Sequence, residues 1–274
     1  MSKIRSLAGQ TVSYGVSSIL ARVLNYALVP LHTSIFSPAE FGTISGLYAF
    51  AAFMNILLTF GMETTYFRFA TKTKDQSVYS TAATLVIIIS TITCGSIYFF
   101  RDSFSSAIGY SNEARLVGWL AIIVLIDAIM AIPFARLRLE NKVGRFVLAR
   151  VSNISIVVLL NLICLWIFPM INDGAILPSL QPLLSNIYNA ELRVGYVFLA
   201  NLMASASLII LLWEPFSKIR LQIKRQYLRP MLVFTLPILL TGFAGTLNDQ
   251  LDKVLIPLFM SKADLGVYLS LIHI

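Results

Sequence analysis

The sequence predicts an all-α integral membrane protein that crosses the bilayer several times. Of its 274 residues, 57% are apolar and only 12% are charged, whereas charged residues make up about a quarter of an ordinary soluble domain. The mean hydropathy is +0.80. A soluble globule of this size cannot bury so much apolar surface behind so few charges. This composition excludes a disordered chain, a secreted disulfide-rich scaffold and a DNA-binding domain.

Seven apolar runs are long enough to span a membrane, because a spanning helix needs about 20 mostly apolar residues. The runs cover residues 9–35, 41–67, 78–100, 115–135, 147–170, 192–213 and 231–259. Their apolar residues are continuous rather than alternating, which favours helices over a transmembrane barrel. The first run is too long for a signal peptide, and no cleavage site follows it. Cys94 and Cys164 fall inside apolar runs, so no disulfide framework is expected.

The basic residues predict that the N-terminus lies in the cytoplasm, because cytoplasmic loops are enriched in Lys and Arg. The predicted inner side carries most of the 21 basic residues: Lys3, Arg5, Arg68, Lys72, Lys74, Arg136, Arg138, Lys142, Arg145, Arg150, Lys218, Arg220, Lys224, Arg225 and Arg229. The predicted outer side carries Arg101, Arg115, Arg193 and Lys262. The net charge of +8 is therefore a topology signal with some lipid-headgroup contact, not a nucleic-acid site.

Two segments of the chain resemble each other and predict an internal repeat. Leu24–Leu31 matches Leu251–Leu258, with a shared proline, and Ser37–Gly42 then matches Ser261–Gly266. Each is the end of an outward-going helix, a polar turn and the start of a return helix. Because both helices run outward, the repeats are parallel and related by an axis along the membrane normal, as in two-lobed transporters.

This repeat predicts the domain organisation. A six-helix lobe occupies residues 1–214, a cytoplasmic linker residues 215–230, and the start of a second lobe residues 231–268. We expect the chain to be an N-terminal fragment of a protein with about twice as many spans. The tail 269–274 no longer matches the first repeat, and we expect it to be non-native.

Polar residues inside the spans predict a central cavity, because ionisable groups at membrane depth are costly and mark functional sites. Arg22 shares one helix face with Ser18 and Asn25, and the repeat places Asn25 in register with Asp252. The two repeats therefore each present a polar stripe, and we expect both stripes to face one central cavity on the pseudosymmetry axis. The predicted cavity residues are Arg22, Ser18, Asn25, Asn55, Glu63, Arg68, Asn248 and Asp252. The predicted ion-coupling residues are Asp127, Asp249, Asp252 and Lys253.

Structural roles are the alternative for each of these groups. Asp127 is also expected to pair with a buried arginine such as Arg22, and the acids around Lys253 could form an internal ion pair with it. Glu63 and Arg68 near the inner mouth are equally suited to anchoring at the interface, and polar residues such as Asn161 commonly join helices to one another.

Nothing in the sequence predicts an enzyme. The chain has two histidines, His32 and His273, no phosphate-gripping glycine-rich loop and no His/Cys cluster with metal-ligand spacing. We therefore expect no catalytic residues, no metal and no cofactor, with coupling to a proton or a sodium ion as the energy source.

Several motifs resemble those of the polysaccharide exporters in the multidrug/oligosaccharidyl-lipid/polysaccharide flippase superfamily. They are the run Ser37–Gly42 after a Pro30-containing helix, the run Gly61–Phe69 closing the second span, and a seventh span with Pro237 near its start and Asn248, Asp252 and Lys253 near its end. The resemblance covers residues 1–268. It implies two six-helix lobes that alternate access to the two sides of a bacterial cytoplasmic membrane.

The resemblance also implies a cargo and partners. The cargo is a lipid-diphosphate-linked oligosaccharide, moved from the cytoplasmic to the periplasmic leaflet for O-antigen or other surface polysaccharide. Expected partners are this lipid-linked glycan, membrane lipids and polysaccharide-assembly proteins, with no nucleic acid. Two alternatives are a drug/cation antiporter of the same superfamily and a membrane glycosyltransferase or polymerase. Arg22 argues against the former, and the absence of a large outer loop with acids, His or Arg argues against the latter.

Overall fold

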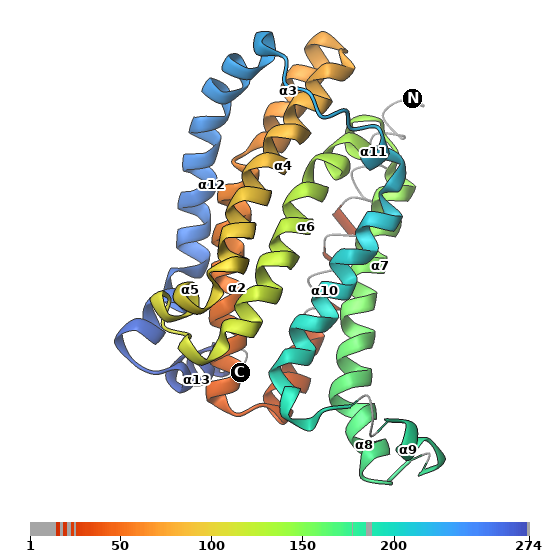
Figure 1. The fold of residues 1–274 in the computed structure, drawn as a ribbon, viewed down its shortest axis with the longest axis vertical. Helices are drawn as coiled ribbons and strands as arrows, with labels where there is room; N and C mark the ends of the chain where they lie inside the picture. Colours follow the sequence, from red (N-terminus) through yellow and green to blue (C-terminus); the bar gives the residue numbers. More distant parts are fainter. Residues whose placement is uncertain are drawn as a thin grey trace.

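The computed structural model describes residues 15–16, 19–20, 23–24, 26–176, 178–184 and 188–272. These residues contain no strand, and their helices pack side by side as a bundle (Figure 1). Among them, the segments long and apolar enough to cross a membrane are Pro38–Thr73, Gln76–Phe99, Ser111–Leu139, Val143–Asn172, Arg193–Leu211 and Arg225–Phe259. They correspond to six of the seven predicted spans, so the all-α multi-pass fold is confirmed. Of the first predicted span, residues 26–35 are described continuously and are helical.

Short connections join the successive α-helices. They are α2 (Pro38–Thr59), α3 (Met62–Thr73), α4 (Gln76–Phe99), α5 (Arg101–Ala107), α6 (Ala114–Leu139), α7 (Val143–Leu162), α8 (Phe168–Asn172), α9 (Gln181–Leu184), α10 (Arg193–Leu211), α11 (Trp213–Ser217), α12 (Arg225–Phe259) and α13 (Lys262–Ile272). A π-helical segment, Ile163–Ile167, joins α7 to α8, and short 3-10 turns precede α6, α9 and α10.

The bundle has two chemically different ends. One end, called the basic end below, holds the ends of α3, α6 and α10, the whole of α11, and the starts of α7 and α12; it lies at the top of Figure 1. The opposite end holds α5, α8 and α13. The predicted inner basic residues that the structure describes lie at or near the basic end.

Helix α6 is the centre of the bundle, because it packs against α2, α4, α7 and α10. Small residues such as Ala128 and Ala135 are fully buried along it, together with Ile132. Small side chains let helices approach closely in a membrane, where packing rather than the hydrophobic effect joins them. Helices α12 and α13 both pack against α2, and α12 also packs against α3 and α4, so α2 is the main element of the predicted first lobe in contact with the second repeat.

The second predicted span, 41–67, is broken into α2 and α3. Phe60 and Gly61 have left-handed φ angles of 36° and 72°, and this conformation ends α2. Breaking a helix frees backbone carbonyls that must be satisfied inside a membrane. The hydroxyl of Thr235 on α12 donates to the Phe60 carbonyl at 2.6 Å, and the absent side chain of Gly61 leaves room for Ile238. The break is therefore a docking point for α12.

The repeated turns form the same helix cap. At the start of α2, the Glu40 amide donates to the Ser37 hydroxyl at 3.3 Å, and the Ser37 amide donates to the Glu40 carboxylate at 2.8 Å. At the start of α13, the Asp264 amide donates to the Ser261 hydroxyl at 3.1 Å, and the Ser261 amide donates back at 2.9 Å. Such a reciprocal cap satisfies two free amides of the first turn.

The two capped helices also cross each other reciprocally, at a place called the glycine crossing below. A Cβ atom on Gly42 of α2 would overlap the carbonyl oxygen of Lys262, and a Cβ atom on Gly266 of α13 would overlap that of Pro38. Pro38 matches Lys262 in the repeat, just as Gly42 matches Gly266. The contact thus has local two-fold symmetry, and only glycine allows backbones this close.

The chain between the predicted lobes, within the predicted linker 215–230, runs along the start of α4. After α11, the backbone amides of Arg220 and Gln222 donate to the hydroxyls of Ser80 and Thr84 at 3.3 and 3.2 Å. Hydroxyls on α4 therefore supply the partners that a non-helical segment lacks. This segment delivers the chain to Arg225, where α12 begins.

Candidate functional site

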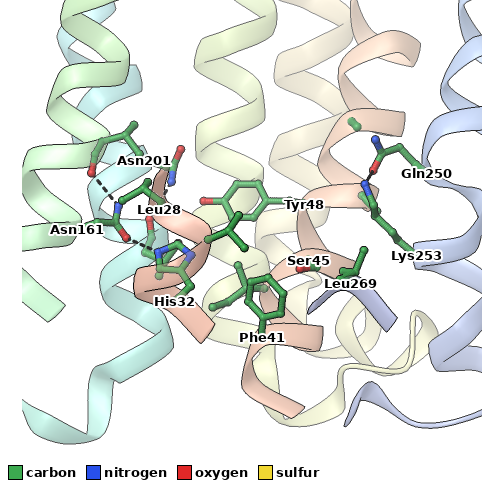
Figure 2. Close-up of a pocket in the computed structure, with 16 residues that line it drawn as sticks. Leu28, His32, Phe41, Ser45, Tyr48, Asn161, Asn201, Gln250, Lys253 and Leu269 are labelled. Atoms are coloured by element: carbon green, nitrogen blue, oxygen red, sulfur yellow. Dashed lines mark hydrogen bonds between the residues drawn. The ribbon is translucent and has the colours of Figure 1, made fainter. Parts of the chain in front are cut away.

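A cleft lies between the two repeats, towards the end of the bundle opposite the basic end. Its volume is about 500 Å³. One wall comes from helical residues 26–35, α7 and α10, the floor from α2, and the other side from α12 and α13 (Figure 2). The polar residues that line it are His32, Ser45, Tyr48, Asn161, Asn201, Gln250 and Lys253.

On the first wall, a buried pair joins the first helix to α7. Nε2 of His32 lies 3.0 Å from Oδ1 of Asn161, and both residues are buried. The Asn161 amide nitrogen already donates to the Val157 carbonyl at 2.8 Å, so its oxygen is the atom that faces the imidazole. Nε2 of His32 therefore carries a hydrogen and donates it.

Tyr48 forms the floor beside this pair. Its ring stacks on Phe198 of α10, with centroids 5.1 Å apart and planes 10° from parallel. Asn201, one turn further along α10, donates to the Val197 carbonyl at 2.9 Å and also lines the cleft. The helical spacing of these residues places aromatic and amide groups on the same face of α10.

The opposite side of the cleft carries its charge. The Lys253 ammonium donates to the Gln250 side-chain oxygen at 2.9 Å, and Figure 2 shows both side chains across the cleft from His32. Among the described lining residues, Lys253 is the only Lys or Arg and none is acidic. The cleft thus combines amides, hydroxyls and one cation with apolar walls such as Leu28 and Ile44. This chemistry suits an anionic ligand that is rich in hydroxyl groups.

The structure places the predicted cavity residues in different surroundings. Asn55 does not line the cleft, and its backbone carbonyl accepts a hydrogen bond from the Thr59 hydroxyl. Glu63 forms an ion pair with Arg138 of α6. Arg68 lies over the ring of Phe234, 4.0 Å from its centroid, and so joins α3 to α12. Ser18, Arg22 and Asn25 lie outside the described residues.

The predicted ion-coupling residues are also separated. Lys253 lines the cleft, whereas Asn248, Asp249 and Asp252 do not. Asn248 donates to Asp249 at 3.3 Å, and a carboxylate oxygen of Asp252 accepts the backbone amide of Lys253 at 2.9 Å. No ion pair joins Lys253 to either acid in the described part of the chain.

Asp127 lies in α6, within the predicted first lobe. The Ser205 hydroxyl of α10 donates to its carboxylate at 2.7 Å, and this partner was not predicted from the sequence. The predicted arginine partner, Arg22, is not among the described residues. Asp127 therefore joins α6 to α10 at membrane depth.

Of the seven polar residues that line the cleft, only Lys253 is among the predicted cavity and ion-coupling residues. Three of the others, Ser45, Asn201 and Gln250, drew no prediction of any kind. A signal existed for Asn201, because it is a lone amide in an otherwise apolar run, like Asn161. Gln250 lies next to the predicted ion-coupling residues Asp249, Asp252 and Lys253, but its uncharged side chain gives no such signal. Ser45 has no signal, since serines are common in spanning helices.

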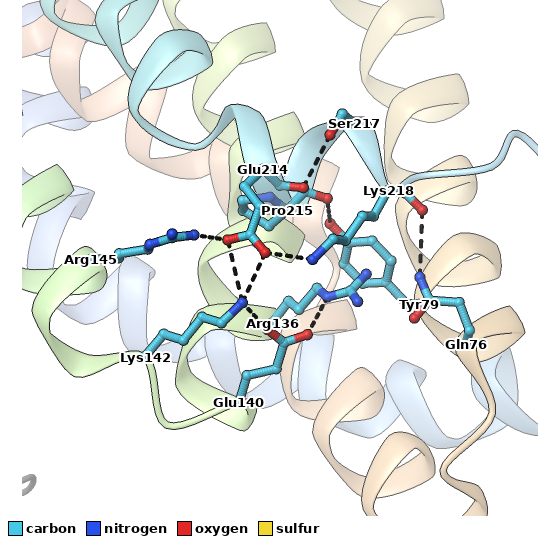
Figure 3. A network of polar contacts seen from close by, with 10 residues as sticks. All are labelled: Gln76, Tyr79, Arg136, Glu140, Lys142, Arg145, Glu214, Pro215, Ser217 and Lys218. Carbon is cyan, nitrogen blue, oxygen red and sulfur yellow. Dashed lines mark hydrogen bonds and ion pairs between the residues drawn. The ribbon is translucent and has the colours of Figure 1, made fainter.

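A second polar cluster, called the basic-end network below, holds α4, α6, α7 and α11 together (Figure 3). Glu214 of α11 pairs with Lys142 at 2.9 Å and also with Arg145 and Lys218. Glu140 pairs with Arg136 at 2.6 Å and with Lys142 at 2.7 Å. Two carboxylates thus form ion pairs with four basic side chains.

Arg136 and Tyr79 anchor this network in the bundle. Arg136 is buried, and its guanidinium lies 4.4 Å from the centroid of the Tyr79 ring. The Tyr79 hydroxyl donates to the Pro215 carbonyl at 2.6 Å. Burial alone would raise the pKa of Glu140, but hydrogen bonds from Lys142 and Arg136 and their charges outweigh burial and lower it. The network therefore holds Glu140 in its charged form.

Comparison with known proteins identifies one family. A family model described as polysaccharide biosynthesis protein matches residues 7–271 of the chain. No curated protein and no solved structure matches the chain. The matched range includes the cleft, the glycine crossing and the basic-end network.

Proposed function

Because the chain belongs to the family of polysaccharide biosynthesis proteins, we propose that it translocates a lipid-diphosphate-linked oligosaccharide across a bacterial cytoplasmic membrane. The cargo, a polysaccharide repeat unit, moves from the cytoplasmic to the periplasmic leaflet by alternating access. The product feeds assembly of a surface polysaccharide such as O-antigen. Polysaccharide-assembly proteins are the expected partners on the receiving side.

The observation that carries this proposal is the cleft between the repeats. A sugar needs hydroxyl and amide partners, which Ser45, Asn161 and Asn201 offer. A diphosphate needs a cation in a site of low dielectric, and Lys253 offers one that no described acid neutralises. The two requirements of a lipid-diphosphate-linked glycan therefore meet in one cavity.

The positions of the basic residues support a direction. A cytoplasmic basic end satisfies the positive-inside rule, and the cleft then lies towards the periplasmic leaflet. The glycine crossing borders the cleft on that side, because Phe41, next to Gly42 on α2, lines it. In this arrangement a second lobe rocks against the first about α2, and cargo enters from the cytoplasm.

Coupling is proposed for the acids at membrane depth. Asp127, whose carboxylate accepts a hydrogen bond from Ser205, is suited to taking up a proton or a sodium ion. Asp249 and Asp252 on α12 are the candidates on the second repeat. Drug/cation antiport, the alternative function, is disfavoured because the described lining of the cleft is cationic and contains no acid.

Replacement of Lys253 in the full-length protein tests the proposal. Lys253→Gln should lower surface-polysaccharide export by about tenfold or more, because charge-assisted hydrogen bonds contribute about 1.5–3 kcal/mol, and lipid-linked precursor should accumulate on the cytoplasmic side. Lys72→Gln, at an exposed position of the basic end, is the matched control and should export normally. Normal export by Lys253→Gln at unchanged protein level would show that the cleft does not carry the anionic head.

A second test addresses Arg22, which we propose as a further contact to the diphosphate. Arg22→Ala should abolish export at unchanged protein level. Arg22→Lys should impair it, because the planar fork that binds phosphate is lost while the charge remains. If Arg22→Ala only lowers abundance and neutralising Asp127 rescues it, Arg22 is a structural ion-pair partner.

A further inference from the structure

A second cavity lies at the end opposite the basic end, where α4, α5 and α6 meet. Its volume is about 460 Å³. The residues that carry its chemistry are Tyr98, Arg101, Asp102, Arg115, Gly118 and Trp119. The cavity shares no lining residue with the cleft, and the proposed function uses none of these side chains.

Packing on α6 holds the two arginines in place. A Cβ atom on Gly118 would lie 3.3 Å from Cδ of Arg101 and 3.6 Å from the Tyr98 ring, so both groups pack against the bare backbone of α6. The Arg101 guanidinium lies 5.5 Å from the centroid of the Tyr98 ring, and that of Arg115 lies 4.8 Å from the centroid of Trp119. These cation–π contacts orient both guanidinium groups at the cavity.

The two guanidinium groups are not neutralised by the protein. Within the described ranges, no carboxylate lies within 4.0 Å of the charged nitrogens of Arg101 or Arg115. Asp102 lines the same cavity but is exposed. Two cations and one acid leave a net positive charge in a place where few basic residues are found, since the predicted outer side carries only four.

The surroundings of the cavity are those of a membrane boundary. Phe99 and Phe100, next to Tyr98, are 81% and 69% exposed, and exposed phenylalanines at the end of a spanning helix face the acyl chains. Amphipathic rings such as Tyr98 and Trp119 lie at the level of lipid headgroups. The cavity therefore opens where the phosphate groups of lipids are.

We propose that Arg101 and Arg115, supported by Trp119 and Gly118, form a binding site for the phosphate of an anionic phospholipid at this boundary. Arginine binds phosphate through two parallel N–H donors, and two such forks with one opposing carboxylate favour a headgroup with net negative charge. In the orientation proposed above, the lipid belongs to the periplasmic leaflet. The site is distinct from the cargo cleft and independent of which cargo the protein carries.

Quenching of Trp119 fluorescence tests the site. The full-length protein with its other tryptophans replaced by Phe is placed in phosphatidylcholine nanodiscs, and brominated phosphatidylglycerol or brominated phosphatidylcholine is added. Phosphatidylglycerol should quench Trp119 several-fold more effectively. Each of Arg101→Gln and Arg115→Gln should remove most of this preference, because each substitution removes one forked set of charge-assisted hydrogen bonds to the phosphate. Arg229→Gln at the basic end is the control and should not change it.

Two further variants keep the proposal falsifiable if the glutamine variants are unstable. Asp102→Asn removes the opposing charge at an exposed position and should strengthen the preference. Arg101→Lys with Arg115→Lys keeps the charge and should lose most of the preference, because the forks are gone. Equal quenching by both lipids in the unmodified site, or full preference in the double lysine variant, would overturn the proposal. Loss of the preference in millimolar inorganic phosphate would overturn it too, because the ligand would then be a soluble anion.

Discussion

Alanine at Gly42 or Gly266 should separate α2 from α13 at the glycine crossing. The built Cβ atom overlaps a helical carbonyl oxygen, whereas real Cβ atoms keep at least 3.0 Å. A carbonyl in the first turn of a helix cannot rotate away without losing its hydrogen bond. The two helices must therefore move apart by more than about 1 Å, and close-packed interiors do not absorb such a shift freely.

The expected cost is about 1–3 kcal/mol for each alanine, as for other overpacked positions. The double variant should cost less than the two single costs added together, because one separation of the helices relieves both overlaps. A double-mutant cycle on the thermal unfolding of the full-length protein measures this coupling. Gly95→Ala on α4 is the matched control, since nothing lies within 4 Å of its Cβ position; it should be neutral or stabilising by up to about 1 kcal/mol.

The same variants should open the cleft. Ser45→Cys places a thiol in the cleft lining, and its labelling by a membrane-impermeant maleimide should become faster when either glycine is replaced. Unchanged melting and unchanged labelling in Gly42→Ala and Gly266→Ala would refute the reasoning, because the helices would then have room that the structure denies them.

Three further outcomes are expected. Acidification through the lowered pKa of Glu140 should destabilise the basic-end network. A carboxyl with a depressed pKa contributes its full stability above its unfolded pKa of about 4.3 and loses that stability as pH falls through its folded pKa. Glu140→Gln should therefore flatten this part of the stability–pH curve. Thr235→Val should lower the melting temperature, since the Phe60 carbonyl loses its donor at a cost of about 1–3 kcal/mol, whereas Thr235→Ser should remain close to the parent. Cysteines at Asp173 and Gln222 should be labelled from outside and inside the cell respectively, and the reverse pattern would overturn the proposed orientation.

The spans could be predicted from the sequence because their cause is local. An apolar run of spanning length must satisfy its backbone internally, so it is a helix whatever its neighbours are. The helix caps are local as well, because Ser37 reaches Glu40 within one turn, and Ser261 reaches Asp264 in the same way. The left-handed break at Phe60 was not predicted, although Gly61 beside it is a common signal for one.

Neighbour relations depended on the tertiary structure. Helical spacing identifies which residues share a face, but it does not say which helix that face meets. Glu63 was grouped with cavity residues by its spacing, yet the nearest cation in the fold is Arg138 of α6, and the two pair at the basic end. Lys253 and Asp249 are close in sequence, but only Lys253 lines the cleft.

The repeat shows which features can be read from the sequence and which depend on tertiary contacts. Its matching residues, Ser37 with Ser261 and Gly42 with Gly266, can be read from the sequence alone. That each glycine meets the backbone of the other repeat is a long-range contact, and it exists only because α13 folds back across α2. The sequence by itself determined the apolar spans, their order and the caps of the repeated turns, but not the break at Phe60, since spans and caps depend on residues within a few turns. The tertiary structure alone decided the cleft, the crossing and the ion pairs, because they join residues that only packing brings together.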